Sequence, residues 1–335
     1  KIVNVEKIKI SAGSASVLGL ISIGKFKDSQ RTCYLMTFKE GHCTANCGFC
    51  PQAKSSESSE EMLSRVNWPT FPFEKFLIKL QELHPTKNFE RICIQTLRYP
   101  ENFTDLKEII IQIRKYVDIP ISVSIPPMSN DKLRMLKNVG VQRVGIALDG
   151  ATQEIFDMVK GKGVNGPYRW EHHYQKLNEA VSIFSEGFVS THIIIGLGET
   201  EKDIIERIED LQNLKILTSL FAFTPIKGTK FEDLSQPPLL RFRKLQLGRY
   251  LIVNKKKTQE DFTFNLGGDI VKINIRRAEL INIINNTDTF LTSGCPGCDR
   301  PYYTSKPSGP IYNYPRKLDE SEDKEIYKSL CRFVN

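Results

Sequence analysis

Short runs of β-branched and apolar residues alternate with longer amphipathic runs along most of this chain, from residue 31 onward. Strands separated by helices of roughly ten or more residues need crossover connections, so the alternation predicts parallel βαβ units. We count eight strand-like runs, which predicts an α/β fold that is a complete or near-complete (β/α)8 barrel; an open doubly wound sheet is the alternative. The predicted strands are 32–38, 91–96, 121–125, 143–149, 192–196, 220–223, 262–266 and 288–292, and the predicted helices are 73–83, 104–116, 130–138, 172–186, 201–213, 238–253 and 272–284.

The conspicuous polar and cysteine motifs follow predicted strands, which is where a barrel of parallel strands carries its chemistry. The segment G-H-C-T-A-N-C-G-F-C follows the first strand, Gln95 and Arg98 follow the second, and Asp149 ends the fourth. The segment Cys295-Pro-Gly-Cys298 follows the eighth strand. Because a closed barrel brings its first and last loops together, the two cysteine motifs should face one mouth of the barrel.

The strand pattern divides the chain into an N-terminal extension (1–30), the barrel (31–292) and an irregular C-terminal tail (293–335) with a short helix near 320–332. No apolar run reaches the roughly 18–20 residues of a bilayer span, and no signal-peptide pattern opens the sequence, so we expect a cytoplasmic protein without a membrane partner. The formal net charge of +8 suits an acidic partner, or a basic surface that maintains solubility.

Three of the eight cysteines, Cys43, Cys47 and Cys50, lie within eight residues of one another. Such clustering is unlike a disulfide framework and is typical of metal ligands in a reducing compartment. Three thiolates on one loop can bind three corners of a [4Fe–4S] cluster and leave the fourth iron open. A zinc site completed by His42 or Cys33 is the alternative, although zinc normally takes paired Cys-x2-Cys ligands.

The segment C-T-A-N-C-G-F-C resembles the CxxxCxΦC signature of radical S-adenosylmethionine (SAM) enzymes, with Phe49 at the aromatic position. The resemblance implies that the open iron binds the amino and carboxylate groups of SAM. Reductive cleavage of SAM then yields a 5′-deoxyadenosyl radical, which abstracts hydrogen from unactivated carbon. The same resemblance implies a TIM-type barrel of the radical SAM kind, catalytic cluster ligands at Cys43, Cys47 and Cys50, and an electron donor such as ferredoxin or flavodoxin.

Further motifs resemble the biotin synthase-like branch of that superfamily. Cys-Pro-Gln at 50–52 resembles its cluster loop, A-L-D-G at 147–150 its fourth-strand motif, and I-I-I-G-L-G-E-T at 193–200 its fifth-strand motif. In that branch these positions, together with a second-strand residue and the T-P-I loop after the sixth strand, contact the ribose, adenosyl, methionine and adenine parts of SAM. The resemblance therefore assigns cofactor binding to Phe49, Gln95, Asp149, Gly196, Gly198 and Pro225.

The chain departs from biotin synthase at that enzyme's second cluster, a [2Fe–2S] centre built from three strand cysteines and an arginine. Cys93 lies near the first of those positions, but no cysteine follows until Cys295, so we expect that a biotin synthase cluster cannot be assembled. Cys295 and Cys298 have the spacing of two ligands of one metal and predict an auxiliary iron–sulfur cluster. Cys33 or Cys93 could supply a further ligand, and Cys331 is a weaker candidate.

The segments C-P-G-C-D-R-P-Y-Y and I-Y-N-Y-P (311–315) resemble the biotin synthase-related proteins that act as paired, archaeal-type lipoyl synthases. The resemblance implies a radical SAM sulfurtransferase that inserts sulfur into an octanoyl chain on a lipoyl carrier protein or domain, with a paired radical SAM subunit as a second partner. Such carriers are typically acidic, which fits the net charge. A basic run is either a docking face for the carrier or a solvated helix face: Arg241, Arg243, Lys244, Arg249, Lys255, Lys256 and Lys257.

Other functions fit parts of the pattern. A radical SAM enzyme that modifies tRNA would also have two clusters and a basic surface, but 299–335 is too short for an appended RNA-binding domain. Another alternative is a different sulfur-inserting enzyme of the biotin synthase-like branch. The non-enzymatic alternative is a zinc protein that binds nucleic acid.

Overall fold

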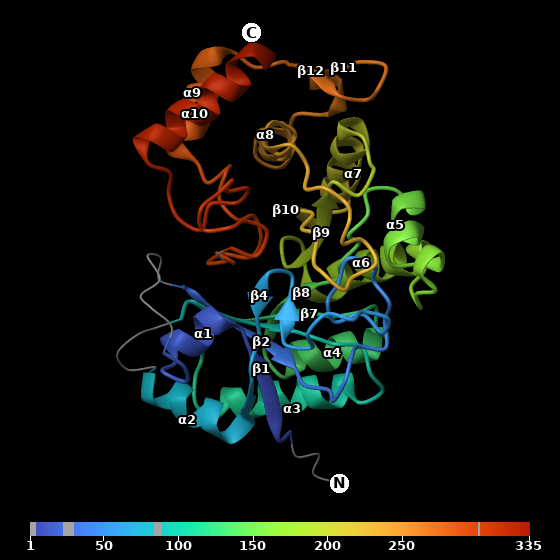
Figure 1. The fold of residues 1–335 in the computed structure, drawn as a ribbon, viewed down its shortest axis with the longest axis vertical. Coiled ribbons are helices and arrows are strands. Elements are labelled where there is room, and N and C mark those ends of the chain that lie inside the picture. The colour runs from blue at the N-terminus through green and yellow to red at the C-terminus, as the bar shows by residue number, and fades with distance from the viewer. Residues whose placement is uncertain (1–4, 23–29, 84–88, 301) are drawn as a thin grey trace.

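The computed structural model describes residues 5–22, 30–83, 89–300 and 302–335. Its main sheet contains six parallel strands in sequential order, as βαβ units joined by crossover helices require (Figure 1). The predicted α/β fold class is confirmed, in the form of a partial barrel. The six strands are β2 (Thr32–Thr37), β6 (Arg91–Gln95), β7 (Ile121–Ser124), β8 (Val141–Gly145), β9 (Val189–Ile195) and β10 (Leu217–Ala222).

Two short antiparallel strands extend the sheet beyond β2, and the sheet does not close in the described part of the chain. β1 (Lys7–Ile10) pairs with β2 on one side and with β5 (Thr70–Pro72) on the other. Because β5 and β10 form the two ends of the strand order, an opening remains where two further barrel strands were predicted.

The predicted seventh and eighth strands do not join this sheet. β11 (Phe262–Phe264) pairs with β12 (Ile270–Ile273) in a separate two-stranded hairpin. The turn between them contains Gly267 and Gly268, and Gly268 has a φ of +79°, a conformation that favours glycine. This tight turn lets β11 pair with the neighbouring β12 and not with the main sheet. The predicted strand at 288–292 makes only an isolated bridge, from Leu291 to Tyr314.

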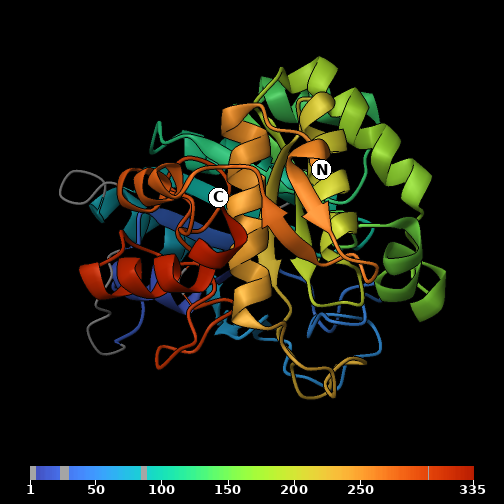
Figure 2. The ribbon, with the colours of Figure 1, turned by 90° about the horizontal axis from the view of Figure 1, so that it is seen from above.

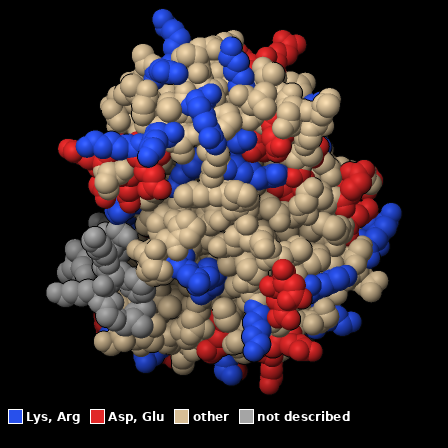
Figure 3. All heavy atoms as spheres, turned by 45° about the horizontal axis from the view of Figure 1, so that its top comes forward, with Lys and Arg blue, Asp and Glu red and all other residues tan. Residues whose placement is uncertain are grey.

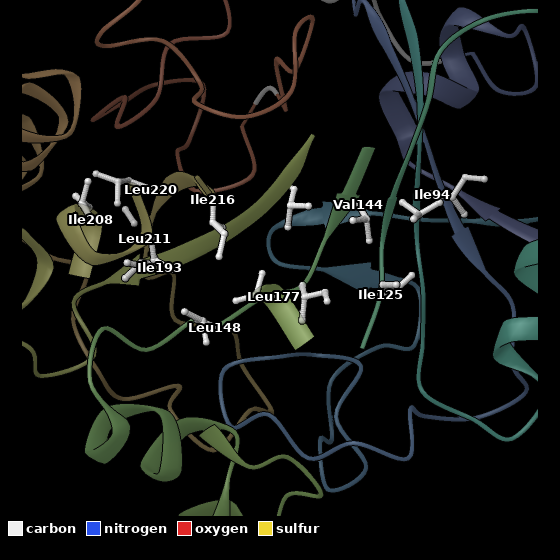
Figure 4. Close-up of a cluster of buried hydrophobic side chains, with 14 of the residues drawn as sticks. Ile94, Ile125, Val144, Leu148, Leu177, Ile193, Ile208, Leu211, Ile216 and Leu220 are labelled. Carbon is white, nitrogen blue, oxygen red and sulfur yellow. The ribbon is translucent and has the colours of Figure 1, made fainter. Parts of the chain in front are cut away.

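Amphipathic helices cover the outer face of the partial barrel, close to their predicted positions. Their apolar sides form the main hydrophobic core with the sheet, which includes Ile94, Val144, Leu177 and Ile193 (Figure 4). No helix among the described residues is long and apolar enough to cross a membrane. The helices of this layer are α2 (Phe73–Leu83), α3 (Asn102–Arg114), α4 (Asn130–Asn138), α6 (Trp170–Phe184), α7 (Glu201–Asn213) and α8 (Leu239–Lys255), and two shorter ones, α1 (Ala12–Val17) and α5 (Gln153–Val159), were not predicted.

The C-terminal part of the chain packs on α8. The helices α9 (Arg277–Asn286) and α10 (Glu320–Leu330) lie together, and α10 flanks α8 on the side opposite the β11–β12 hairpin (Figure 2). The predicted helix near 320–332 is confirmed by α10. Between α9 and α10, the tail runs back toward the opening of the barrel (Figure 1).

The tail is fixed to both sides of that opening by hydrogen bonds. Ser293 Oγ accepts from the backbone N–H of Leu220 on β10 at 3.0 Å. On the other side, Thr32 Oγ1 donates to the carbonyl of Gly297 at 2.7 Å, and Arg91 Nε donates to the carbonyl of Pro296 at 3.0 Å. The tail therefore bridges the gap between the first and last parallel strands without adding a strand to the sheet.

Candidate active site

The cysteine triplet (Cys43, Cys47 and Cys50) lies on the loop that follows β2, at the carboxyl ends of the parallel strands. The Sγ atom of Cys43 accepts hydrogen bonds from the backbone N–H groups of Ala45 at 3.4 Å and Arg98 at 3.1 Å. Burial raises the pKa of the Cys47 thiol to about 12 and that of Cys50 further. Without a cation these buried thiols stay protonated, and binding to iron would deprotonate them.

Among the described residues, no group of three or more His, Cys, Asp or Glu side chains converges on a position for a single metal ion. A [4Fe–4S] cube binds each thiolate at a different iron and so requires separated sulfur atoms on a shared loop. The triplet supplies three free cysteines from one loop, which is the donor set that such a cluster needs.

An interior cavity of about 160 Å³ adjoins the triplet and is lined by two of the six predicted cofactor residues. Cys50, Phe49 and Gln95 line it, as does Thr224 of the T-P-I loop after β10. The remaining wall is largely apolar and includes Leu63, Ile194, Phe221, Phe223 and Tyr303. Asp149, Gly196, Gly198 and Pro225 are not among the residues that line this cavity.

Asp149 lies just behind the cavity wall, in a buried charge cluster that the sequence did not reveal. Its carboxylate is 2.7 Å from Lys160 Nζ and 2.7 Å from His192 Nε2, and His192 itself lines the cavity. Burial alone would raise the pKa of Asp149, but Lys160 and His192 lower it well below its ordinary value. The carboxylate is therefore ionised.

The glycine motif after β9 forms a tight turn that shapes the same region. Gly196 and Gly198 have φ values of +106° and +111°, and a Cβ atom on Gly196 would lie 2.9 Å from Pro237. The buried Glu199 carboxylate accepts the backbone N–H groups of Gly196 at 2.7 Å and Leu197 at 2.9 Å, which fixes the turn. Gly196 and Gly198 thus have a conformational role here, and Glu199 is a structural residue that the sequence analysis missed.

A second cavity lies deeper in the barrel and brings together three cysteines, Cys93, Cys295 and Cys298, which we term the interior cysteines. Cys93 comes from β6, and the other two come from the tail that bridges the opening. Their sulfur atoms meet polar side chains: Gln95 Nε2 is 3.2 Å from Cys93 Sγ, Ser122 Oγ is 3.4 Å from Cys295 Sγ, and Tyr34 Oη is 3.6 Å from Cys298 Sγ. Burial raises the pKa of Cys298 to about 12 and also raises that of Cys93.

Arg300 lies beside the interior cysteines and was not predicted as a site residue. Its guanidinium carbon is within 6 Å of the ring centres of Tyr34, Phe221 and Tyr303, so aromatic faces surround the charge. Burial acts to lower the pKa of Arg300, but attraction to Cys298 and Cys93 in their thiolate form raises it overall. Together with His192 and Phe221, Arg300 lines both cavities, which makes it part of the wall between the triplet side and the interior cysteines.

Three expectations about the cysteines need correction. The two cysteine motifs do not face one mouth, because the tail contacts Thr32 and Arg91 at the amino ends of their strands while the triplet follows a carboxyl end. A set of three cysteines and an arginine does come together inside the barrel, but the tail supplies the members that the strands lack. Cys33 packs in the outer core against the helices and does not line the interior cavity, and Cys331 lies at the end of α10.

The basic run on and after α8 is not a continuous docking face. Arg243 and Lys244 are buried, where Arg243 donates to tail carbonyls and Lys244 is 2.6 Å from Glu201. Arg249 donates to the carbonyl of Thr218, and Arg241 pairs with Glu199. In the surface view, Lys and Arg side chains are interspersed with Asp and Glu around a broad uncharged area (Figure 3).

Comparisons with known proteins agree with this geometry. The model of the radical SAM superfamily matches residues 41–211, which is just over half of the chain. The chain is 27% identical over 203 residues to biotin synthase from Clostridium tetani, covering 60% of this chain and 58% of that protein. It is 24% identical over 217 residues to biotin synthase from Persephonella marina, covering 63% of this chain and 60% of that protein.

The aligned part thus spans about three fifths of those relatives' length. Among solved structures, methylornithine synthase aligns with a TM-score of 0.49 and 12% identity, over 71% of this chain and 77% of that one. The triplet loop, the parallel strands that follow it and the family match together show that this chain belongs to the radical SAM superfamily, with biotin synthases as distant homologues.

Proposed function

We propose that this protein is a sulfur-inserting radical SAM enzyme with an auxiliary iron–sulfur cluster, and that its substrate is an octanoyl chain carried on a protein lysine, as in lipoyl synthases. When bound, the two clusters and SAM would supply a hydrogen-abstracting 5′-deoxyadenosyl radical and a source of sulfur.

One observation carries the proposal: the triplet and the interior cysteines lie on opposite sides of one set of wall residues, His192, Phe221 and Arg300. A substrate carbon held near these shared residues could lose hydrogen on the triplet side and receive sulfur from the side of the interior cysteines. The cavity beside the triplet is lined mostly by aromatic and aliphatic side chains, which suits an unbranched alkyl chain.

The protein side chains fit a cluster at the interior cysteines. Three thiolates would bear negative charge in a buried site, and Arg300 provides a fixed positive charge beside them. Ser122 donates its hydroxyl group to the Cys295 sulfur atom at 3.4 Å, and such hydrogen bonds tune iron–sulfur centres. The resemblance of the tail to paired lipoyl synthases supports an acidic lipoyl carrier domain as substrate and a paired radical SAM subunit as partner.

The test is anaerobic reconstitution followed by single turnover on an octanoylated carrier peptide, read by mass spectrometry. We expect a mass gain that corresponds to a C–S bond, together with 5′-deoxyadenosine. The matched control is Cys295→Ser/Cys298→Ser, which should form 5′-deoxyadenosine and add no sulfur. Production of 5′-deoxyadenosine by the wild-type enzyme without any sulfur in the peptide, alone or with the paired subunit, would refute the octanoyl assignment.

Similarity to biotin synthases favours a second candidate substrate within the same chemistry. The three interior cysteines and Arg300 match the composition, although not the strand origin, of the biotin synthase cluster described above. Dethiobiotin should therefore be offered in parallel under the same conditions. Sulfur insertion into dethiobiotin in preference to the octanoyl peptide would assign the enzyme to biotin formation instead.

A further inference from the structure

A separate groove lies on the outer side of the triplet loop and belongs to neither interior cavity. Its volume is about 620 Å³, and its walls are the loops that follow β6 and β7 and the loop that precedes α6. The floor is formed by prolines, Met128, Tyr99 and Tyr168. It shares no lining residue with the interior cavities.

The groove is positively charged and has no acidic wall residue. Arg98, Lys132, Arg169 and His172 line it, and no Asp or Glu does. In the described part of the chain, none of the first three is paired with a carboxylate: Arg98 donates to Thr44 Oγ1 at 3.0 Å, Lys132 lies over the Phe103 ring, and Arg169 donates to backbone carbonyls. These exposed cations are therefore available to an anionic partner.

The groove is also coupled directly to the triplet. Thr44, which follows Cys43, is a wall residue, and the backbone N–H of Arg98 donates to Cys43 Sγ at 3.1 Å. The backbone N–H of Thr44 donates to the carbonyl of Arg98 at 2.9 Å, which ties the groove wall to the triplet loop. A protein bound here would lie against the outer side of the loop that holds the cleavage cluster.

We propose that this groove is the docking site of an acidic one-electron carrier protein that reduces the cleavage cluster. In the step, the reduced carrier loses one electron, the cluster gains it, and no bond to the protein forms or breaks. Two features favour an electron carrier over the acyl carrier as occupant. The groove contacts the triplet loop, and it has no lining residue in common with the cavity that an acyl chain must reach. The proposal depends on the radical SAM chemistry and not on the octanoyl substrate.

The decisive variant is Lys132→Glu/Arg169→Glu, which reverses two groove charges without touching the triplet. The matched control is Lys272→Glu/Lys328→Glu, because these exposed lysines lie on β12 and α10, in the C-terminal layer shown at the top of Figure 1. The first measurement is the Kd of an acidic ferredoxin for the cluster-free protein. We expect the groove variant to weaken binding by about tenfold or more, the control to change it by less than about twofold, and the wild-type affinity to fall with added salt.

The second measurement is 5′-deoxyadenosine formation by reconstituted enzyme with either reduced ferredoxin or dithionite as reductant. The groove variant should lose most of its ferredoxin-driven rate and retain its dithionite-driven rate, since a small chemical reductant needs no docking site. The charge-preserving variant Lys132→Arg/Arg169→Lys should keep both. If the wild-type protein makes no 5′-deoxyadenosine with dithionite, the radical SAM assignment has failed, whereas the binding result stands on its own.

Three results would overturn the docking proposal. One is unchanged ferredoxin binding in the groove variant, and another is a loss of the dithionite-driven rate equal to the loss of the ferredoxin-driven rate. The third is a groove variant that loses affinity for an octanoylated carrier domain while it binds ferredoxin normally, because the groove would then be a substrate-docking surface.

Discussion

Replacement of Lys160 by methionine tests the buried charge cluster behind the cavity. Lys160 is 4% exposed and follows α5, with its Nζ atom 2.7 Å from Asp149 Oδ2 and 2.7 Å from the carbonyl of Ala147. The aromatic rings of Phe156 and Tyr168 lie within 6 Å of the same ammonium group. Methionine retains the apolar stem and removes the charge, so the variant isolates the ion pair from the packing.

Removal of one partner from a buried ion pair leaves an uncompensated charge, which costs about 3–5 kcal/mol in the free energy of unfolding. In Lys160→Met, His192 remains 2.7 Å from the other carboxylate oxygen of Asp149. We therefore expect the free energy of unfolding to fall by about 3 kcal/mol, the lower end of that range. Asp149→Asn should be similarly destabilising because it leaves Lys160 buried and unpaired. The double variant Asp149→Asn/Lys160→Met contains neither charge and should recover to within about 1–2 kcal/mol of wild type.

The assay is chemical unfolding of the cluster-free protein under reducing conditions, with all four members of the cycle measured at one pH. Lys202→Met is the matched control, because the side chains of Lys202 and its partner Glu206 on α7 are 51% and 42% exposed and the pair should contribute less than about 1 kcal/mol. Two results would show that Asp149 and Lys160 are not energetically coupled. One is a fall in the free energy of unfolding below about 1 kcal/mol in Lys160→Met, and the other is a double variant whose loss equals the sum of the two single losses.

Three further predictions follow from the site. Alanine at all three positions of the triplet should abolish 5′-deoxyadenosine formation while part of the reconstituted iron remains bound, as measured by iron and sulfide analysis; continued cleavage of SAM would contradict the assignment. Serine at the three interior cysteines should remove the remaining iron and leave SAM cleavage intact, whereas Cys33→Ala should retain all of the iron. Burial lowers the pKa of His173 to about 2 from an ordinary value near 6.5, so below about pH 6.5 the unfolded chain binds a proton that the folded chain does not. Between pH 7 and 5.5 the wild-type protein should therefore lose about 1 kcal/mol more unfolding free energy than His173→Gln.

The first six strands and the triplet could be predicted from the sequence because both depend on local pattern. Each strand is a short apolar run before an amphipathic helix, and three cysteines in eight residues are informative without any tertiary context. The prediction of a seventh barrel strand was wrong for a physical reason. The run that became β11 has the composition of a barrel strand, but its nearest pairing partner, β12, lies only a few residues away across a two-glycine turn.

The choice between Cys33 and Cys93 as a third interior ligand was open for a different reason. Successive side chains of a strand point to opposite faces, so each cysteine had to be assigned to the inner or outer face. All six residues of β2 are buried, which leaves no alternation of polar and apolar residues to reveal the inner face. The structure shows that Tyr34 faces the interior and that Cys33 therefore faces the helices.

The way the tail is held determines what the cysteine variants can reveal. Its bonds to Thr32, Arg91 and Leu220 involve backbone carbonyls and Ser293, and Asp299 accepts from both the backbone N–H of Arg31 at 2.7 Å and the Tyr34 hydroxyl at 2.8 Å. None of these bonds uses a cysteine sulfur atom. The tail that carries Cys295 and Cys298 is thus held at the opening by contacts that the cysteine substitutions leave in place. Loss of sulfur insertion in the interior variants, with the tail still folded and SAM still cleaved, would then report on the chemistry of the cluster and not on collapse of the site.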